Sequence, residues 1–147
     1  MPSLTSPSDI IATALANKAP RIKIAAQLQE FPPALFELTE HLEILDLADN
    51  QLSQLPEDFG RFKKLRILFL SNNQFQHIPA VLADCPKLEM IAFKNNRISE
   101  FSEDTLPVDT RWLILTDNQI TQLYVFHTDM GHSTVSGNAG HGIARKS

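Results

Sequence analysis

Three groups of residues in this 147-residue chain have types that could carry chemistry. The first is Asp58-Phe59-Gly60, the tripeptide with which protein kinases bind magnesium. A kinase also needs a glycine-rich loop, a strand lysine and an upstream His-Arg-Asp sequence, and none of these is present. Spacing instead places Phe59 where Leu82 stands 23 residues later, which predicts a buried side chain. We therefore interpret the tripeptide as a coincidence and expect a non-enzymatic chain.

The second group lies in the glycine-rich stretch after residue 123 and contains His127, His132 and His141. A structural zinc site needs four ligands at recognisable spacing, whereas these histidines are five and nine residues apart with no companion cysteine. Ser133 and Ser136 have no matching base and orienting group. A dinucleotide-binding loop needs its glycines directly after a strand, and no strand is predicted before the glycines nearby. We expect no metal ion, no cofactor and no catalytic residue.

The third is Cys85, the single cysteine of the chain, which cannot form an internal disulfide. It stands where Phe62 stands one repeat earlier, so we expect an inert buried thiol. No basic residue precedes the apolar run 10–16, which is also too short to cross a bilayer. The formal net charge of −4 argues against non-specific nucleic-acid binding. We expect a cytoplasmic chain that binds neither nucleic acid nor membrane.

The elements that position these residues follow from an internal repeat. Leu42-x-x-Leu45-x-Leu47-x-x-Asn50-x-Leu52 recurs 23 residues later, and again after a further 23 residues as Leu88-x-x-Ile91-x-Phe93-x-x-Asn96-x-Ile98. The first two of these repeats continue with a second half, in which Leu55-Pro56 or Ile78-Pro79 precedes apolar residues three apart. This spacing predicts a short helix or 3₁₀ turn. The Leu-x-Leu pairs predict short strands that stack in parallel.

Three segments follow from the limits of the repeat. Residues 1–20 are expected to form a lead and a short capping helix, with Ser8 and Asp9 as its N-cap and an end before Pro20. Residues 21–123 contain one irregular repeat, three full repeats and a weaker one around Asn118. Residues 124–147 lack apolar periodicity, and we expect them to be disordered or foreign to the repeat.

These motifs resemble the leucine-rich repeat family, whose signature is Leu-x-x-Leu-x-Leu-x-x-Asn-x-Leu, over residues 21–123. The resemblance implies an α/β solenoid, with short parallel strands on a concave face and helical or 3₁₀ turns outside. The asparagines are expected to be structural, because their amides can satisfy backbone groups in the turns. The Leu-Pro form is similar to the intracellular, Ras-signalling-associated and bacterial types.

A narrower resemblance is to bacterial proteins that join such repeats to a downstream protein-kinase-like domain. It rests on segments such as 65–69 and 111–118. In that family the repeats continue further, whereas here the pattern stops at Tyr124. One hypothesis is therefore a truncated regulatory N-terminal part of a leucine-rich-repeat kinase. Another is a structural array that self-associates through an uncapped C-terminal edge around Leu113 and Leu115.

The favoured hypothesis is a module that binds an unidentified protein partner on its concave face. Side chains that flank the buried leucines point outward from the strands. They form a contiguous, largely apolar surface beside a rim of alternating charge at Glu43, Arg66, Glu89 and Arg111. Contiguous apolar surface usually marks an interaction site. The predicted binding residues are Ile44, Asp46, Ile67, Phe69, Met90, Ala92, Lys94, Trp112 and Ile114.

Overall fold

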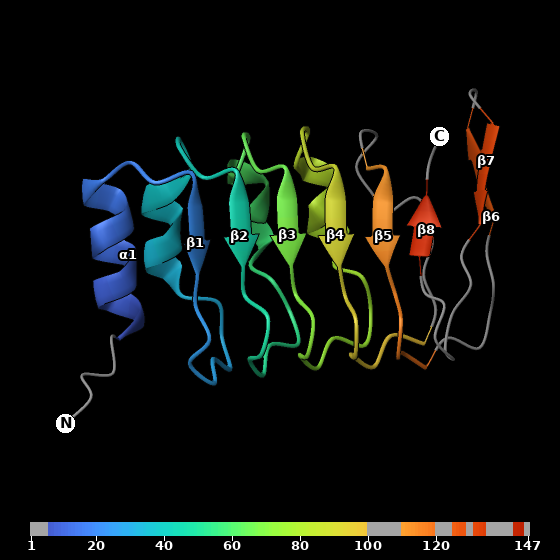
Figure 1. Cartoon of the computed structure of the whole chain (residues 1–147), viewed down its shortest axis with the longest axis horizontal. Coiled ribbons are helices and arrows are strands. Elements are labelled where there is room, and N and C mark those ends of the chain that lie inside the picture. Colours follow the sequence, from blue (N-terminus) through green and yellow to red (C-terminus); the bar gives the residue numbers. More distant parts are fainter. Residues whose placement is uncertain (1–5, 100–109, 120–124, 129–130, 135–142, 146–147) are drawn as a thin grey trace.

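A row of five short parallel strands forms the framework of the molecule (Figure 1). The computed structural model describes residues 6–99 and 110–119, and the backbone of 125–128, 131–134 and 143–145. The five strands lie in chain order, and each pairs with the next in parallel. They are β1 (Arg21–Lys23), β2 (Ile44–Asp46), β3 (Ile67–Phe69), β4 (Met90–Ala92) and β5 (Trp112–Ile114).

The strand register follows the sequence repeat. Leu45 of β2 pairs with Ile22 of β1 on one side and with Leu68 of β3 on the other. Ile91 and Leu113 continue the same row across β4 and β5. All five side chains are buried, at most 4% exposed. The predicted α/β solenoid with stacked parallel strands is thus confirmed.

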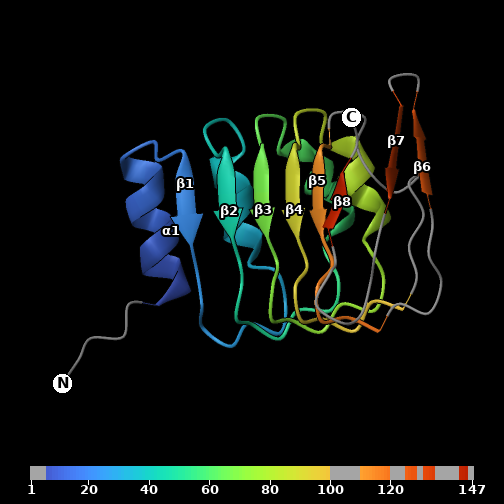
Figure 2. The same ribbon diagram turned by 45° about the vertical axis from the view of Figure 1, so that its right-hand side comes forward.

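Short 3₁₀ helices lie behind the row of strands and cover one side of the sheet, as the turned view shows (Figure 2). Each is preceded by a proline, Pro32, Pro56 or Pro79, whose φ lies between −67° and −60°. A proline fixes its own φ near −65°, which sets the direction in which the chain enters the turn. The helices are η1 (Pro33–Leu38), η2 (Glu57–Arg61) and η3 (Ala80–Asp84).

Aromatic side chains fill the space between the first two 3₁₀ helices. Phe59 and Phe62 have ring centroids 5.1 Å apart, and Phe31 contacts both at 5.7 and 6.1 Å. The ring of Phe36 stacks on Phe62 at 5.5 Å and carries the Arg61 guanidinium 4.8 Å above it. Such ring pairs add to the burial energy of the core.

A helix covers the N-terminal end of the stack. α1 (Pro7–Ala16) buries Ile11 and Ala14 against the first repeat. Its N-cap is Ser6, whose Oγ accepts a hydrogen bond from the Asp9 backbone N–H at 3.2 Å. The prediction of Ser8 and Asp9 as the cap was therefore wrong. Pro7 begins the helix because a first-turn position needs no N–H donor.

The repeat asparagines connect neighbouring coils. Nδ2 of Asn73 donates to the carbonyl of Leu70 in its own coil at 3.1 Å and to that of Leu47 in the preceding coil at 3.0 Å. Its Oδ1 accepts from the Leu52 backbone N–H at 2.9 Å. Asn50 makes the same contacts with the irregular first repeat. This confirms the predicted structural role of the asparagines.

Three further strands follow the last repeat. β6 (Val125–Thr128) and β7 (Gly131–Thr134) form an antiparallel pair, while β8 (Ile143–Arg145) pairs antiparallel with β5. The sequence predicted no regular element in this segment, because it lacks apolar periodicity. The physical reason for β8 lies in β5, whose outer edge would otherwise leave backbone donors and acceptors without strand partners. The predicted boundary between residues 123 and 124 stays a prediction.

Candidate functional site

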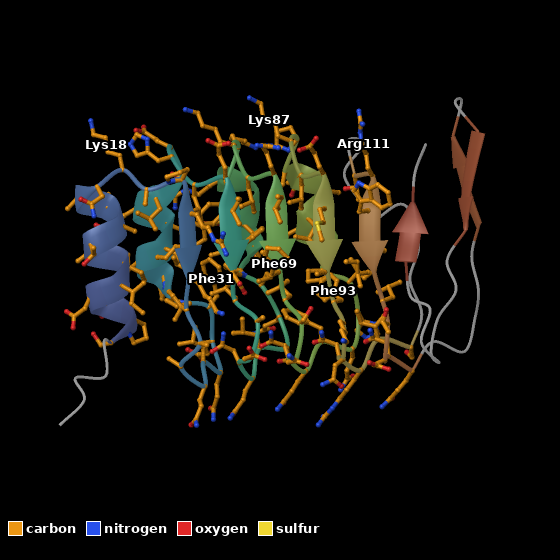
Figure 3. The ribbon with its side chains drawn as sticks, viewed as in Figure 1. Lys18, Phe31, Phe69, Lys87, Phe93 and Arg111 are labelled. Carbon is orange, nitrogen blue, oxygen red and sulfur yellow. The ribbon has the colours of Figure 1, made fainter. Side chains whose placement is uncertain are left out.

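The outward side chains of β1–β5 form one continuous surface, which we call the strand face (Figure 3). Its side chains alternate with the buried row because successive residues of a strand point to opposite sides. Register places the predicted residues in two columns. The first column is Ile44, Ile67, Met90 and Trp112, and the second is Asp46, Phe69, Ala92 and Ile114.

The exposure of the strand face is uneven. Trp112 is 42% exposed, and Lys94 beyond β4 is also exposed. Phe69 and Met90 are half-buried, as are the three isoleucines at 44, 67 and 114. Half-buried apolar side chains keep part of their surface exposed to water, and a bound partner would bury that part. The structure thus brings the predicted residues together on one surface.

Ala92 departs from the prediction. It is 4% exposed, so it offers a partner almost no surface of its own. Phe69 and Ile114 flank it in register on the neighbouring strands. Both have much larger side chains than alanine, which accounts for its burial. Ala92 is therefore covered by its two neighbours and is not a contact residue.

Asp46 has a local structural contact. Its carboxylate Oδ1 accepts a hydrogen bond from the backbone N–H of Ala48 at 3.0 Å, and the side chain is half-buried. This contact holds the carboxylate at the end of β2, where the chain leaves the sheet. Asp46 is thus a fixed polar group beside the apolar columns.

The charged rim beside the strand face is centred on Arg66. Its guanidinium lies 3.0 Å from a Glu89 carboxylate oxygen and 3.4 Å from one of Glu43. The hydrogen bond and charge of Glu89, followed by those of Glu43, raise the pKa of Arg66. Exposed pairs of this kind add little to stability, because water and salt screen them. Arg111 continues the rim, and its backbone N–H donates to the Glu89 carbonyl at 2.8 Å.

Two cations on the strand face were missed by the sequence analysis. Arg21 and Lys23 are exposed on either side of buried Ile22. Register places them beside Ile44 and Asp46, so they begin the two columns. The signal was present in the sequence. The match between Ile22-x-Ile24 and Leu45-x-Leu47 implies that residues 21 and 23 point outward.

Packing accounts for the kinase-like tripeptide. Phe59 is fully buried, as its place in the repeat predicted. Gly60 lies against η3, and a Cβ built on it would stand 2.5 Å from the Cβ of Asp84. Asp58 is exposed at the start of η2. Core filling and close helix packing therefore explain the last two residues of the tripeptide.

Cys85 is buried, as predicted. Its side chain is 0% exposed, and Sγ donates to the carbonyl of Phe59 at 3.6 Å. Burial raises the pKa of the thiol to about 12, with Asp84 adding to the rise and Lys63 opposing it. A thiol with this pKa remains protonated at neutral pH and is a poor nucleophile.

The residues considered for metal binding lie in the C-terminal segment. His127 of β6 pairs in register with His132 of β7, and Ser133 is also on β7. His141 and Ser136 lie outside the described residues. In the part of the chain that the structure describes, no three metal-binding side chains form a group. No helix within that part is long and apolar enough to span a membrane.

Comparison with known proteins supports the geometry. A leucine-rich repeat family model matches residues 25–75. A solved structure of a leucine-rich repeat protein from Leptospira interrogans is similar with a TM-score of 0.56 and 22% sequence identity. The fold is a leucine-rich repeat solenoid. None of the curated proteins matches the chain by sequence.

The similarity to the Leptospira protein covers 73% of this chain and 34% of that one. The chain therefore spans about a third of the length of that protein. At this level of identity the likeness concerns the fold of the repeats. The strand face, with its own residues, must carry any argument about function.

Proposed function

We propose that the chain is a non-enzymatic module that binds a protein partner through its strand face. The observation that carries the proposal is the run of apolar side chains across β2–β5, from Ile44 to Trp112. These side chains are exposed or half-buried although the repeats behind them have a complete core. Contiguous apolar surface of this kind is typical of interaction sites.

Trp112 and Phe69 are the proposed anchors. Aromatic residues and methionine are enriched at the centres of interfaces, and tryptophan is among the commonest hot-spot residues. Ile44, Ile67 and Met90 lie in the same column as Trp112, whereas Ile114 lies on β5 in the column of Phe69. Asp46 and Lys94 supply a polar border.

The test compares partner capture by the wild-type chain with capture by Trp112→Ala and Phe69→Ala. Both variants should lose the partner while the far-UV circular dichroism stays unchanged, because neither side chain belongs to the core. Leu15→Ala is a matched control, since Leu15 is 39% exposed on α1, away from the strand face. Unaltered capture by both face variants would contradict the proposal.

We also propose a cytoplasmic location, on the evidence of Cys85. This free thiol is buried in the core rather than engaged in a disulfide, and free thiols persist in reducing compartments. Cell fractionation with an antibody to the chain is the measurement. Recovery in a secreted or membrane fraction would contradict the location.

Two alternatives to the binding module stay predictions. The kinase-associated hypothesis is tested by the coding DNA, in which another reading frame downstream of residue 123 should resume Leu-x-Leu repeats. If neither of the other two reading frames continues the Leu-x-Leu repeats, that hypothesis is wrong. The self-association hypothesis concerns the outer edge of β5, with which β8 pairs in this structure.

A further inference from the structure

A cationic end distinguishes the strand face from a simple apolar patch. Arg21 and Lys23 project from β1 on the same side as Ile44 and Asp46. They lie at the N-terminal end of both columns, whereas the aromatic anchors lie on β3 and β5. The surface therefore changes from charged to apolar along the row of strands.

Two of the other charged groups on this side of the sheet, Arg66 and Asp46, already have side-chain partners, whereas Lys94 beyond β4 is exposed. Arg66 bridges Glu43 and Glu89, and Asp46 accepts a hydrogen bond from its own strand end. In the part of the chain that the structure describes, the ion pairs are these two, and both involve Arg66. Arg21 and Lys23 thus form no ion pair within that part of the chain, and their charges are available to an incoming group.

The strand spacing sets the length of a complementary segment. Strands in a sheet are about 4.8 Å apart, so β3 lies about 10 Å and β5 about 19 Å from β1. An extended peptide advances about 3.3 Å per residue. A peptide crossing the strands would therefore place residues about three and six positions from its β1 contact over β3 and β5.

We propose that the strand face binds an extended protein segment that is acidic at one end and apolar over the rest. Its Asp or Glu carboxylates pair with Arg21 and Lys23, and its large apolar side chains cover Phe69, Met90 and Trp112. The inference rests on the proposed function, because it names the kind of partner for the same surface. Carboxylate pairs with arginine are strong charge-assisted contacts.

Nucleic acid fits this surface less well than an acidic peptide. Binding to a phosphate backbone needs several cations along a track, whereas the columns carry cations at β1 and then apolar residues from β2 to β5 apart from Asp46. The formal net charge of −4 also repels a polyanion. An acidic and apolar segment matches both ends of the face.

The experiment selects displayed random 12-residue peptides on the immobilised full chain at low ionic strength. Selected peptides should carry Asp or Glu about three to six residues from large apolar residues. A labelled selected peptide is then titrated by fluorescence anisotropy. The Arg21→Glu/Lys23→Glu variant should raise its Kd about tenfold or more, because two favourable pairs become repulsive. Added salt should weaken wild-type binding more than binding to this variant.

The matched control is Lys64→Glu/Lys87→Glu, which makes the same charge change at exposed lysines in turns before β3 and β4. Lys87 points away from the strands at the edge of the molecule (Figure 3). The Kd of the selected peptide for this control variant should differ from the wild-type value by less than about threefold, since these charges lie outside the columns. Far-UV circular dichroism of both variants should match wild type, because all four side chains are exposed.

The outcomes separate this inference from the proposed function. Selected peptides could lack acidic residues, bind the Arg21→Glu/Lys23→Glu variant normally and fail to bind Phe69→Ala. That outcome would overturn the inference and leave the proposed function standing. Peptides indifferent to Phe69→Ala and Trp112→Ala would overturn both. A wild-type dimer that the charge reversal dissociates would identify a second copy as the occupant, and would also overturn the inference.

Discussion

At the residue scale, Gly60 shows how closely the outer helices pack. Its hypothetical Cβ would lie 2.5 Å from Asp84 Cβ and 3.3 Å from the Asp84 carbonyl oxygen. Carbon atoms in contact are normally about 3.5–4.0 Å apart. A side chain at Gly60 therefore requires η2 and η3 to separate. The residue is needed for close approach of the two helices.

Gly60→Ala should lower the free energy of unfolding by about 1–3 kcal/mol, the usual cost of overpacking. Urea denaturation measures the change. Adding Asp84→Gly should recover part of the loss, because it removes the Cβ that the new methyl group meets. Ala83→Gly, the exposed equivalent position one repeat later, is the control and should cost only about 0.5–1 kcal/mol. An unchanged stability of Gly60→Ala would contradict the packing argument.

Cys85 should make stability depend on pH above neutrality. Its thiol pKa rises from 9.0 in the reference state to about 12 in the fold, mainly because burial disfavours the thiolate. The folded state therefore holds the proton more tightly. The contribution of the buried, protonated thiol to the free energy of unfolding is fully present below pH 9.0, and it is lost progressively as pH rises toward about 12.

The measurement is the free energy of unfolding of wild type and Cys85→Ala between pH 7 and pH 11. The fall in stability above pH 9 should be steeper in wild type, since alanine has no proton to lose. The difference between the two curves isolates the thiol from other groups that titrate in this range. Parallel curves would show that Cys85 does not titrate differently on unfolding.

At the scale of the elements, two asparagine rows hold successive coils together in different ways. Asn73 is 7% exposed and bonds backbone groups of two coils. Its neighbour Asn72 is exposed, has a φ of 57°, and donates to Asp49 one repeat earlier. The buried row satisfies the turns, whereas the exposed row occupies left-handed positions that asparagine tolerates.

Asn73→Ala should cost about 2–4 kcal/mol in the free energy of unfolding. The substitution leaves the Leu52 N–H in the core without a partner, which costs about 1–3 kcal/mol. It also removes one of the two hydrogen bonds to the Leu47 carbonyl, which keeps its bond from Asn50. Asn72→Gly is the control, because glycine adopts positive φ without strain. It should change stability by less than about 1 kcal/mol. Equal effects of the two variants would refute the distinction between the rows.

At the scale of the whole molecule, the repeat made most of the fold predictable. Equivalent positions such as Leu45, Leu68 and Ile91 share one environment, so their register follows from the sequence spacing. The same periodicity located Phe59 and Cys85 in the core and Phe69 and Trp112 on the strand face. A periodic chain can be interpreted in this way because each coil contacts mainly its neighbours.

What the sequence did not predict depends on contacts outside the period. The burial of Ala92 results from the size of its neighbours across the strands, Phe69 and Ile114. The N-cap at Ser6 depends on the choice between nearby serines, which composition alone does not make. The pairing of β8 with β5 joins residues about thirty apart without any repeat signal. Each of these requires the three-dimensional arrangement.

The two ends of the solenoid are closed in different ways. α1 covers the first coil with buried side chains, whereas β8 covers β5 by backbone pairing of Leu113 with Ala144 and of its neighbours. An open strand edge offers its backbone groups to another chain. Two copies of β5 could pair antiparallel about a twofold axis and form a closed dimer. We therefore expect β8, which occupies the edge of β5, to oppose self-association.

A chain ending at Gly142, which lacks β8, should accordingly dimerise while the full chain remains monomeric. Light scattering coupled to size exclusion measures the mass, which should approach twice the monomer value as concentration rises. A chain ending at Arg145 keeps all of β8 and is the matched control, so it should behave like the full chain. If the chain ending at Gly142 stays monomeric at every concentration, the β5 edge does not drive association, and β8 has no role in preventing it.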